Sequence, residues 1–317
     1  MAVKTNFTKK VFHEILAKYN LGNLVESKNF KAGYVQTNIL IKTTEGKFVL
    51  RYYENRTKKR VDFEAKLLTF LAEKNYPIAK PIPNKNENFI GIFNKKPFII
   101  FEYITGRHLK NLNDIQFKEL VHKLSLLHKL TKNYDIGNYI HKEPRSKNFC
   151  IKAAKEELKR FEDKEKGKFR YNIIKSQLDT ISFPENLTKG IVHGDFDKSN
   201  VKFYNNEIAG ILDFDDSHYG YRIHDLGILI LYWARFYTNK IDFSIARKII
   251  TSYEEINPLT KIEKKHLFDA FKFSALMIMS WLMYDKWKGK DLFKILSKAL
   301  DEIDIIGRKK FYDELFK

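Results

Sequence analysis

Apolar and polar residues alternate along the first third of the chain in a pattern that favours β-strands around one helix. Strand-rich runs flank residues 44–46, where Gly46 can take the backbone conformation that a hairpin turn needs. Apolar side chains then recur at helical spacing and stop before Pro77. In chain order, the expected elements are strands at 34–43 and 47–53, a helix at 58–74, and strands at 89–93 and 97–103. This pattern predicts a small antiparallel sheet with one helix.

Beyond Gly106 the period of the apolar positions becomes that of helices. Residues 117–130 place their leucines on one face, which is typical of an amphipathic helix. Further helices are expected at 152–167, 224–238, 242–255, 260–287 and 290–316, and short strands at 191–192, 201–204 and 208–212. The predicted fold class is therefore α+β, with a small sheet-rich lobe at residues 1–103 joined at about 102–106 to a larger, mainly helical lobe at 107–317.

The composition agrees with two lobes and bears on the partners. A chain of 317 residues exceeds what one hydrophobic core usually serves, and 44% apolar residues can fill two. The formal net charge of +19 would suit a nucleic acid or an anionic membrane. Lysines, however, are spread through nearly every expected helix and far outnumber arginines, which favours a solvated surface. We therefore expect no nucleic-acid partner.

Cysteine content and hydropathy bear on the compartment. Cys150 is the only cysteine, so neither an internal disulfide nor a thiolate zinc site can form. No apolar segment of a secretory signal follows the basic residues near the N-terminus. The most apolar stretch, residues 273–284, is too short to span a bilayer and reads as a buried helix. We expect a cytoplasmic protein without a membrane partner, and the sequence does not indicate its oligomeric state.

The strongest chemical pattern lies between residues 191 and 215. Asp195 follows a short strand, Asn200 stands five residues later, and Asp213 comes thirteen residues after that amide. Transfer of a phosphoryl group to a hydroxyl needs an oriented acceptor for the hydroxyl proton. It also needs divalent cations, which prefer carboxylate and amide oxygens as ligands. The spacing therefore favours a phosphotransferase site.

The same segment carries a specific resemblance. His-Gly-Asp at 193–195, an Asn five residues beyond the Asp, and an apolar strand that runs into Asp213 and Phe214 resemble the catalytic and metal segments of the aminoglycoside phosphotransferase, choline kinase and homoserine kinase superfamily. Proteins of this superfamily are similar to protein kinases in fold. The resemblance therefore implies a two-lobe kinase-like fold, with a nucleotide-binding first lobe and a second lobe that holds catalysis and the substrate.

The resemblance also implies roles for individual residues. It makes ATP the phosphoryl donor and Asp195 the catalytic base, with Asn200 and Asp213 as ligands of Mg²⁺. His193 would shape the catalytic loop. Asp225, which the Asp-Leu pair at 225–226 aligns with the family pattern, would brace this loop from below.

In the first lobe, the resemblance covers five candidate nucleotide-binding positions. Gly33 stands in the hairpin that would cover the nucleotide, and Arg51 stands where the family carries a basic residue on its third strand. Glu64 on the following helix is the expected ion-pair partner of Arg51. Glu102 and Ile104 lie in the hinge, where their backbone groups would bind the edge of adenine.

The acceptor is expected to be a small hydroxylated molecule. The segments at 48–54, 63–68 and 76–82 most resemble the homoserine kinase type of the superfamily, whereas residues 214–220 are closer to the generic aminoglycoside phosphotransferase pattern. Aminoglycoside, choline and sugar kinases therefore remain alternatives, and a non-catalytic pseudokinase or a basic nucleic-acid-binding protein are more distant ones. Candidate substrate contacts are Asp215 and Asp216, next to the metal segment.

Overall fold

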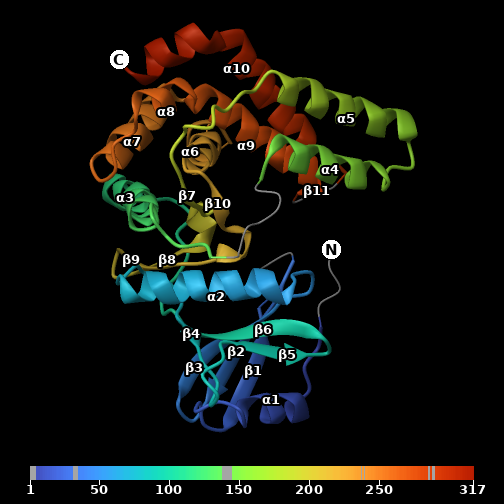
Figure 1. The fold of residues 1–317 in the computed structure, drawn as a ribbon, viewed down its shortest axis with the longest axis vertical. Coiled ribbons are helices and arrows are strands. Elements are labelled where there is room, and N and C mark those ends of the chain that lie inside the picture. The colour runs from blue at the N-terminus through green and yellow to red at the C-terminus, as the bar shows by residue number, and fades with distance from the viewer. Residues whose placement is uncertain are drawn as a thin grey trace. The chain divides into compact units, whose positions relative to one another are not determined.

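The computed structural model is described here for residues 5–30, 35–137, 145–236, 238, 240–284, 286–287 and 290–317 (Figure 1). The chain forms two compact units, which we describe separately. The first unit comprises Met1–Asn111 and Lys198–Asp215, and the second comprises Leu112–Asp197 and Asp216–Lys317. The hairpin that follows the catalytic segment therefore belongs to the first unit, together with the first lobe. A single boundary at residues 102–106 would instead assign this hairpin to the second lobe. The lobe boundary itself stays a prediction.

The first unit is built on one antiparallel sheet. Its elements are α1 (Lys9–Leu16), β1 (Leu24–Asn29), β2 (Thr37–Thr43), β3 (Gly46–Tyr52), α2 (Lys58–Glu73), β4 (Pro81–Ile82), β5 (Ile90–Phe93), β6 (Lys96–Glu102), β8 (Val201–Tyr204) and β9 (Glu207–Ile211). The strand order is β1-β2-β3-β6-β4, and β5 also pairs with β6. The predicted hairpin turn is confirmed, since Gly46 has a φ of +141° between β2 and β3.

Helix α1, which the sequence pattern did not predict, covers one face of this sheet. Every second residue of β2 is buried, so its apolar side chains gather on that face. The buried cluster consists of Phe12, Ile15, Leu16, Tyr19, Leu21, Ile39, Ile41, Leu50, Tyr52, Phe98 and Ile100. The first unit therefore has two helices of eight residues or more where the pattern predicted one.

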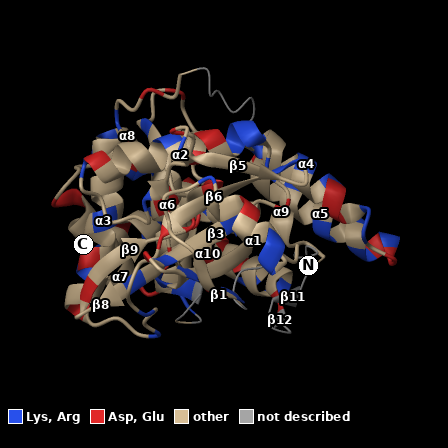
Figure 2. Ribbon diagram, turned by 90° about the horizontal axis from the view of Figure 1, so that it is seen from below, with Lys and Arg blue, Asp and Glu red and all other residues tan. Residues whose placement is uncertain are grey.

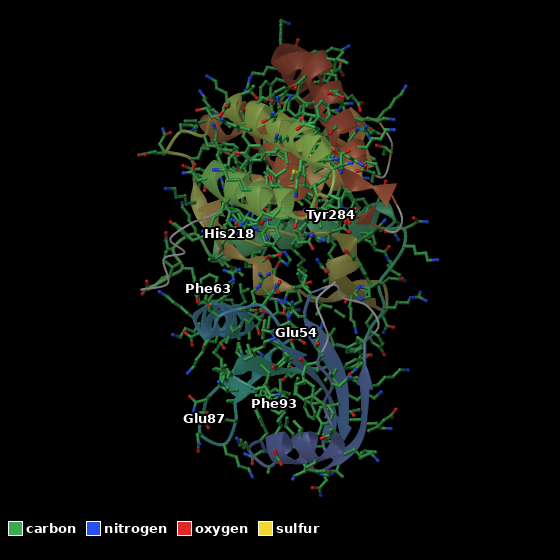
Figure 3. The ribbon with its side chains drawn as sticks, turned by 90° about the vertical axis from the view of Figure 1, so that its right-hand side faces the viewer. Glu54, Phe63, Glu87, Phe93, His218 and Tyr284 are labelled. Atoms are coloured by element: carbon green, nitrogen blue, oxygen red, sulfur yellow. The ribbon has the colours of Figure 1, made fainter. Side chains whose placement is uncertain are left out.

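Glu54 and Phe93, both labelled in Figure 3, join the N-terminal segment to this sheet. The Glu54 carboxylate accepts hydrogen bonds from the backbone N–H of Thr5 at 2.8 Å and from the Thr37 hydroxyl at 2.7 Å, and it pairs with Lys96 at 3.0 Å. The ring of Phe93 lies 4.9 Å from that of Phe7.

Two glycines let the β8–β9 hairpin pack against the segment after β6. A Cβ on Gly106, whose φ is +142°, would lie 2.7 Å from the carbonyl oxygen of Phe203. A Cβ on Gly210 would lie 2.2 Å from Cδ1 of Ile104. The backbones of Arg107 and Phe203 exchange two hydrogen bonds of 2.9 Å. The predicted hinge segment is thereby held against the hairpin that leads to Asp213.

The second unit is mainly helical. Its elements are α3 (Asp114–Leu130), α4 (Lys147–Leu158), α5 (Lys164–Asp179), β7 (Lys189–Val192), β10 (His218–Tyr221), α6 (Ile223–Leu229), the π-helix Ile230–Phe236, α7 (Phe243–Glu254), α8 (Lys261–Lys265), α9 (Leu267–Trp281), β11 (Lys286–Trp287), β12 (Lys290–Asp291) and α10 (Leu292–Leu315). Helix α9 is its centre, because all but two of its 15 residues are buried. It packs against α4, α6 and α10. The prediction of a buried helix in this region is confirmed.

Some predicted helix limits are wrong. The single helix expected at 152–167 is two helices, because α4 ends at Leu158 and Asp163 caps the N-terminus of α5 by accepting a hydrogen bond from the N–H of Lys166. The helix expected at 260–287 is divided at His266 into α8 and α9, and it ends at Trp281, so that residues 286–287 form β11 instead. In both cases apolar residues keep their helical spacing across the break. The spacing alone therefore does not indicate where one helix ends and the next begins.

Basic residues are distributed over the helices of both units. Figure 2 shows lysines and arginines on most helices, interleaved with acidic residues. Cys150 is buried and unpaired. Among the described residues no helix combines the length and the apolar character that crossing a bilayer demands.

Candidate active site

The catalytic segment begins where β7 ends, and a buried aspartate holds its backbone. The N–H groups of His193 and Gly194 donate to the two carboxylate oxygens of Asp225 at 2.7 and 2.9 Å. Gly194 has a φ of +85°, a conformation that favours glycine. Asp225 lies in α6 and has no exposed surface. The loop is therefore fixed by a side chain that comes thirty residues later in the sequence than Asp195.

Asp225 is in turn held by a hydrogen-bonded chain. His128 Nε2 lies 2.9 Å from Asp225 Oδ2, and His128 Nδ1 lies 2.7 Å from the hydroxyl oxygen of Tyr253. Burial alone would raise the pKa of Asp225, but the hydrogen bond and charge of His128 and the N–H of Gly194 lower it. Sequence reasoning missed His128 and Tyr253. A histidine and a tyrosine on otherwise apolar, buried helix faces were the only sequence features that could have indicated them.

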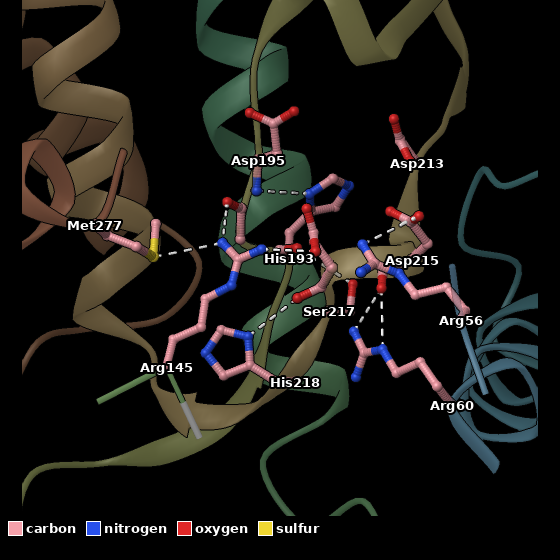
Figure 4. Close-up of polar contacts among 12 residues, drawn as sticks. Arg56, Arg60, Arg145, His193, Asp195, Asp213, Asp215, Ser217, His218 and Met277 are labelled. Atoms are coloured by element: carbon pink, nitrogen blue, oxygen red, sulfur yellow. Dashed lines mark hydrogen bonds and ion pairs between the residues drawn. The ribbon is translucent and has the colours of Figure 1, made fainter. Parts of the chain in front are cut away.

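Asp195 lies directly after this fixed turn. Its backbone N–H donates to Nδ1 of His193 at 3.3 Å (Figure 4), and its carboxylate accepts a hydrogen bond from the Tyr232 hydroxyl at 3.2 Å. His193 is completely buried, and its ring packs edge-on against Phe196. These contacts suit a residue that shapes the loop. Tyr232, in the π-helix, is a third residue that the sequence did not indicate.

Arg145 joins the catalytic loop to α9, again within the second unit (Figure 4). One of its guanidinium nitrogens donates to the carbonyl oxygen of Gly194 at 2.9 Å and lies 3.5 Å from the sulfur of Met277. The other terminal nitrogen pairs with Asp216 at 2.8 Å. Asp216, a predicted substrate contact, thus already has a cationic partner.

In the first unit, Arg51 of β3 brings two carboxylates together. Its Nη2 atom lies 2.7 Å from Asp213 Oδ1 and 3.1 Å from Asp215 Oδ2. Burial alone would lower the pKa of Arg51, but the charges of Asp213 and Asp215 raise it well above the usual value. Arg51 is thus fixed as a cation beside the predicted metal ligand.

Asp215 has further partners from the same unit. Its carboxylate accepts a hydrogen bond from Gln36 at 2.9 Å and pairs with Arg56 at 3.4 Å, and its carbonyl accepts two hydrogen bonds from Arg60 (Figure 4). Although burial opposes ionisation, Arg51 and Arg56 lower the pKa of Asp215. A carboxylate with this many partners is suited to organising the cluster rather than to receiving a substrate ammonium.

Asp213 has an unusual pKa and an unusual backbone conformation, although it pairs with Arg51. Burial and the charge of Asp215 raise its pKa to about 7, against the effect of Arg51, although 39% of the side-chain surface is exposed. Its φ is +69°, which is unusual for a non-glycine residue and is found at functional sites. The backbone of Asn200 lies beside it, since the Asn200 carbonyl accepts a hydrogen bond of 2.8 Å from Leu212.

These donors fit a magnesium ion. Asp213 supplies carboxylate oxygens and Asn200 an amide oxygen, both hard ligands. Within the described ranges, no group of three or more His, Cys, Asp or Glu side chains is placed to hold a metal ion. Proteins commonly hold Mg²⁺ through one or two carboxylates together with substrate phosphates.

The remaining nucleotide candidates belong to the first unit as well. Glu64 is buried, and burial raises its pKa to about 7 although the charge of Arg51 opposes the shift. Among the described residues, the ion pairs of Arg51 are with Asp213 and Asp215, both through Nη2, and the expected pair with Glu64 is absent although the two charges still interact. Gly33 lies outside the described residues.

In the hinge, some backbone groups are already engaged. The N–H of Glu102 donates to the carbonyl of Lys80 at 2.9 Å, and the carbonyl of Ile104 accepts a hydrogen bond from Lys202 at 2.9 Å. The groups expected to contact adenine are the carbonyl of Glu102 and the N–H of Ile104. They form one acceptor and one donor, the pair that the edge of adenine requires.

With this geometry established, comparisons with known proteins give the family. Residues 26–256 match the phosphotransferase enzyme family. The chain belongs to this family. Homoserine kinase of Bartonella henselae is 26% identical over 290 residues, which make up 90% of this chain and 89% of that protein. Homoserine kinase of Caulobacter vibrioides is 28% identical over 281 residues, 84% of each chain.

Solved structures of phosphotransferases share the fold. An amicoumacin kinase bound to AMP-PNP and Ca²⁺ has a TM-score of 0.70 at 16% identity, covering 97% of this chain and 94% of its own. Choline kinase from Cryptosporidium parvum has a TM-score of 0.68 at 14% identity, covering 98% and 100%. The predicted superfamily and fold class are confirmed, and the chain is a kinase-like phosphotransferase that acts on a hydroxyl group.

Proposed function

We propose that this phosphotransferase transfers the γ-phosphoryl group of ATP to the hydroxyl of a small amino acid, with homoserine as the first candidate. The observation that carries the reaction is the catalytic loop of the second unit, in which Asp225 holds two consecutive N–H groups just before Asp195. The relatives named homoserine kinase, which align over most of the chain, support the acceptor.

Asp195 is the proposed base. Its carboxylate accepts the proton of the acceptor hydroxyl as the oxygen attacks phosphorus. The Tyr232 hydroxyl donates to one carboxylate oxygen and fixes the orientation of the group. His193 and Asp225 position the loop without contacting the reacting atoms. Rigid support of this kind matters because phosphoryl transfer depends mainly on positioning.

The first unit supplies the proposed nucleotide site. Asn200 and Asp213 would hold Mg²⁺, which when bound neutralises charge on the transferred phosphate. Arg51 can bind phosphate oxygens through its forked guanidinium. The carbonyl of Glu102 and the N–H of Ile104 would contact adenine. Gly33 and Glu64 remain predicted members of this site.

The pairing of acidic residues supports a small amino acid over an aminoglycoside. A polycationic acceptor needs several converging carboxylates to pair its ammonium groups. Candidate carboxylates in the second unit instead have basic partners: Asp216 pairs with Arg145, Asp304 with Lys272, and Glu302 with Arg235. An acceptor with one ammonium and one carboxylate needs fewer acidic side chains in its site. Its carboxylate can pair with one of the many basic residues.

A panel of acceptors tests this proposal. Catalytic efficiencies, kcat/KM, would be measured with magnesium ATP for homoserine, choline, a hexose and a kanamycin-type aminoglycoside, with Asp195→Asn as the background control. We expect homoserine to be preferred. A tenfold or greater preference for the aminoglycoside or for choline would replace homoserine by that acceptor class, and phosphorylation of none of them by a protein that binds ATP would favour a non-catalytic binding role.

A further inference from the structure

The second unit contains a pocket that the proposed reaction does not use. Its volume is about 470 Å³, within the range of roughly 300–1,000 Å³ that is typical of small-molecule sites. The beginning of α4, strands β7 and β10, and residues of α6 and α9 form its walls. Neither Asp195 nor Tyr232 is among the lining residues. A ligand held there would not have its reacting group at the proposed base.

The lining is cationic. Arg145, Lys147 and Lys189 contribute to it, and among the described residues that line the pocket there is no Asp or Glu. The guanidinium of Arg145 is held in place by the Gly194 carbonyl and by Asp216, which offsets its charge, so the net positive charge of the lining comes from Lys147 and Lys189. A carboxylate in the pocket would be attracted by several basic side chains. Pairing with Arg145 would cost little side-chain entropy, because this side chain is already held in place.

The first turn of α4 adds backbone donors. Ser146 caps this 12-residue helix by accepting a hydrogen bond from the N–H of Phe149. Ser146, Lys147 and Asn148 all line the pocket. The N–H groups at the start of a helix lack intrahelical partners and carry partial positive charge, which favours an anion there.

His224 provides an independent indication of a ligand. Only 7% of its surface is exposed, it lines the pocket, and neither ring nitrogen has a hydrogen-bond partner among the described residues. Its ring packs against Phe183 and Phe273 with centroid distances of 4.9 and 4.6 Å. Buried polar groups without a partner are uncommon because they cost stability. Both nitrogens have almost no exposed surface, so a ligand with a hydrogen-bonding group would give His224 a partner after the ring turns towards the pocket.

We propose that this pocket is a second binding site, for a small organic carboxylate with a flat apolar body. The carboxylate would lie between Lys147, Lys189 and the first turn of α4, and the apolar body would lie against Tyr221 and Phe273. His224 hydrogen-bonds to the ligand. The site is separate from the acceptor site at Asp195, although Arg145 belongs to the pocket and also contacts the catalytic loop.

Direct binding measurements test the site, with benzoate as the probe. Calorimetry and ligand-observed NMR on the whole chain would compare benzoate with benzyl alcohol and benzylamine, which keep the ring but change the charge. We expect benzoate to bind at least tenfold more tightly than either. Equal affinities for the three would overturn the anion site.

Variants then locate the binding. Lys147→Ala combined with Lys189→Ala is expected to weaken benzoate at least tenfold, whereas Lys129→Ala, an exposed lysine on α3 outside the pocket, should leave it unchanged. His224→Phe keeps a flat ring in the aromatic cluster and is also expected to weaken binding. Equal losses in the double variant and in the Lys129 control would show a general charge effect and overturn the proposal.

A competition experiment separates this site from the acceptor site. In Asp195→Asn protein, which cannot turn over, saturating homoserine should leave the benzoate affinity unchanged. Competitive displacement by homoserine would show that the pocket is part of the acceptor site and would overturn the claim of a second site. Direct titration of homoserine into the same protein shows whether it occupies its site during the competition. A failure of homoserine to bind counts against the proposed acceptor and not against the pocket, so the two proposals can fail separately.

Discussion

At the scale of single residues, the two aspartates of the catalytic loop differ in their surroundings. Asp225 has no exposed surface and receives hydrogen bonds from two backbone N–H groups and from His128. Asp195 is partly exposed and accepts a hydrogen bond from Tyr232. A fully bonded, buried carboxylate with a lowered pKa suits a structural anion, whereas a partly exposed one can exchange a proton with a substrate.

Replacing Asp195 by Asn should remove turnover while leaving nucleotide binding intact. The amide keeps the shape of the side chain but cannot take the hydroxyl proton, so we expect kcat to fall by about 10²–10⁴-fold. Tyr232→Phe is the matched control, since it removes the hydrogen bond to Asp195 but keeps the base, and it should lose less activity. Turnover of Asp195→Asn near the wild-type rate would exclude this residue as the base.

His224 should make the stability of the fold depend on pH. Burial lowers its pKa to about 4, against an ordinary value of 6.5. Between these values the unfolded chain binds a proton that the folded protein does not, so the free energy of unfolding decreases as the pH falls from 6.5 towards 4. The shift corresponds to an upper limit of roughly 3 kcal/mol.

Chemical denaturation at several pH values, comparing the wild type with His224→Phe, measures this effect. The difference between the two curves removes the contributions of other titrating groups. The wild type should lose stability relative to the variant as the pH decreases through this window. Parallel stability profiles for the two proteins would show that His224 is not held neutral by the fold.

Candidate site residues could be picked out from the sequence where a motif carries them, but not where only packing brings residues together. Asp195, Asn200, Asp213 and Asp225 stand at fixed spacings in two short segments, so the sequence could indicate them. The partners that the structure adds come from distant helices: His128 from α3, Tyr253 from α7, and Arg145 from the start of α4. No spacing rule joins residues that become neighbours only when helices pack.

At the scale of elements, the β8–β9 hairpin depends on close backbone approach. Gly106 contacts the carbonyl of Phe203 in β8, and Gly210 of β9 leaves room for Ile104. The hinge segment and the strand that leads to Asp213 are therefore packed against each other within the first unit. A substitution at either glycine should therefore displace both the predicted adenine contacts and the predicted metal ligands.

Gly106→Ala tests this packing. The added methyl group meets a backbone carbonyl at 2.7 Å at a φ of +142°, so we expect a loss of roughly 1–3 kcal/mol of stability and weaker ATP binding. Gly137→Ala is the control, because Gly137 also has a positive φ but no atom lies within 4 Å of the added Cβ. Thermal unfolding and nucleotide titration of both variants provide the comparison. Equal, small effects would mean that the hinge tolerates the change by moving.

Element types were predicted better than element limits. The β2–β3 hairpin followed from alternation and a glycine turn, and α2 followed from helical spacing and a stop before Pro77. The break between α4 and α5 was missed because Phe161 and its neighbours continue the spacing, and only the cap at Asp163 marks the new start. Helix α1 was missed because it has only eight residues.

At the scale of the whole molecule, the chain separates its proposed tasks between the two units. The first unit holds Arg51, Asn200 and Asp213, and the second holds Asp195 and its supports. The net charge of +19 is spread over both, so charge alone indicates loose association and solubility rather than a partner. Family and fold followed from the sequence motifs. The acceptor did not, because the candidate contacts Asp215 and Asp216 are paired by tertiary contacts that no sequence spacing indicates.

This division predicts different effects of two substitutions on stabilisation by nucleotide. A ligand that binds only the folded protein adds about 2.7 kcal/mol at a concentration 100-fold above its Kd, which raises Tm by several degrees. Asp195→Asn should keep this shift with a magnesium complex of a non-hydrolysable ATP analogue, because Asp195 is assigned to the acceptor. Asp213→Asn should lose most of it, because the amide lacks the charge that would hold the metal.

Asn is the informative replacement at 213, since it tolerates the positive φ of +69° that alanine would strain. The unliganded Tm of each variant serves as its own reference, and excess EDTA separates metal-dependent from metal-independent binding. A wild-type shift that disappears with EDTA, is retained in Asp195→Asn and is lost in Asp213→Asn is the expected result. If the two variants instead show equal shifts, Asp213 does not hold the metal, and its raised pKa and unusual backbone need another explanation.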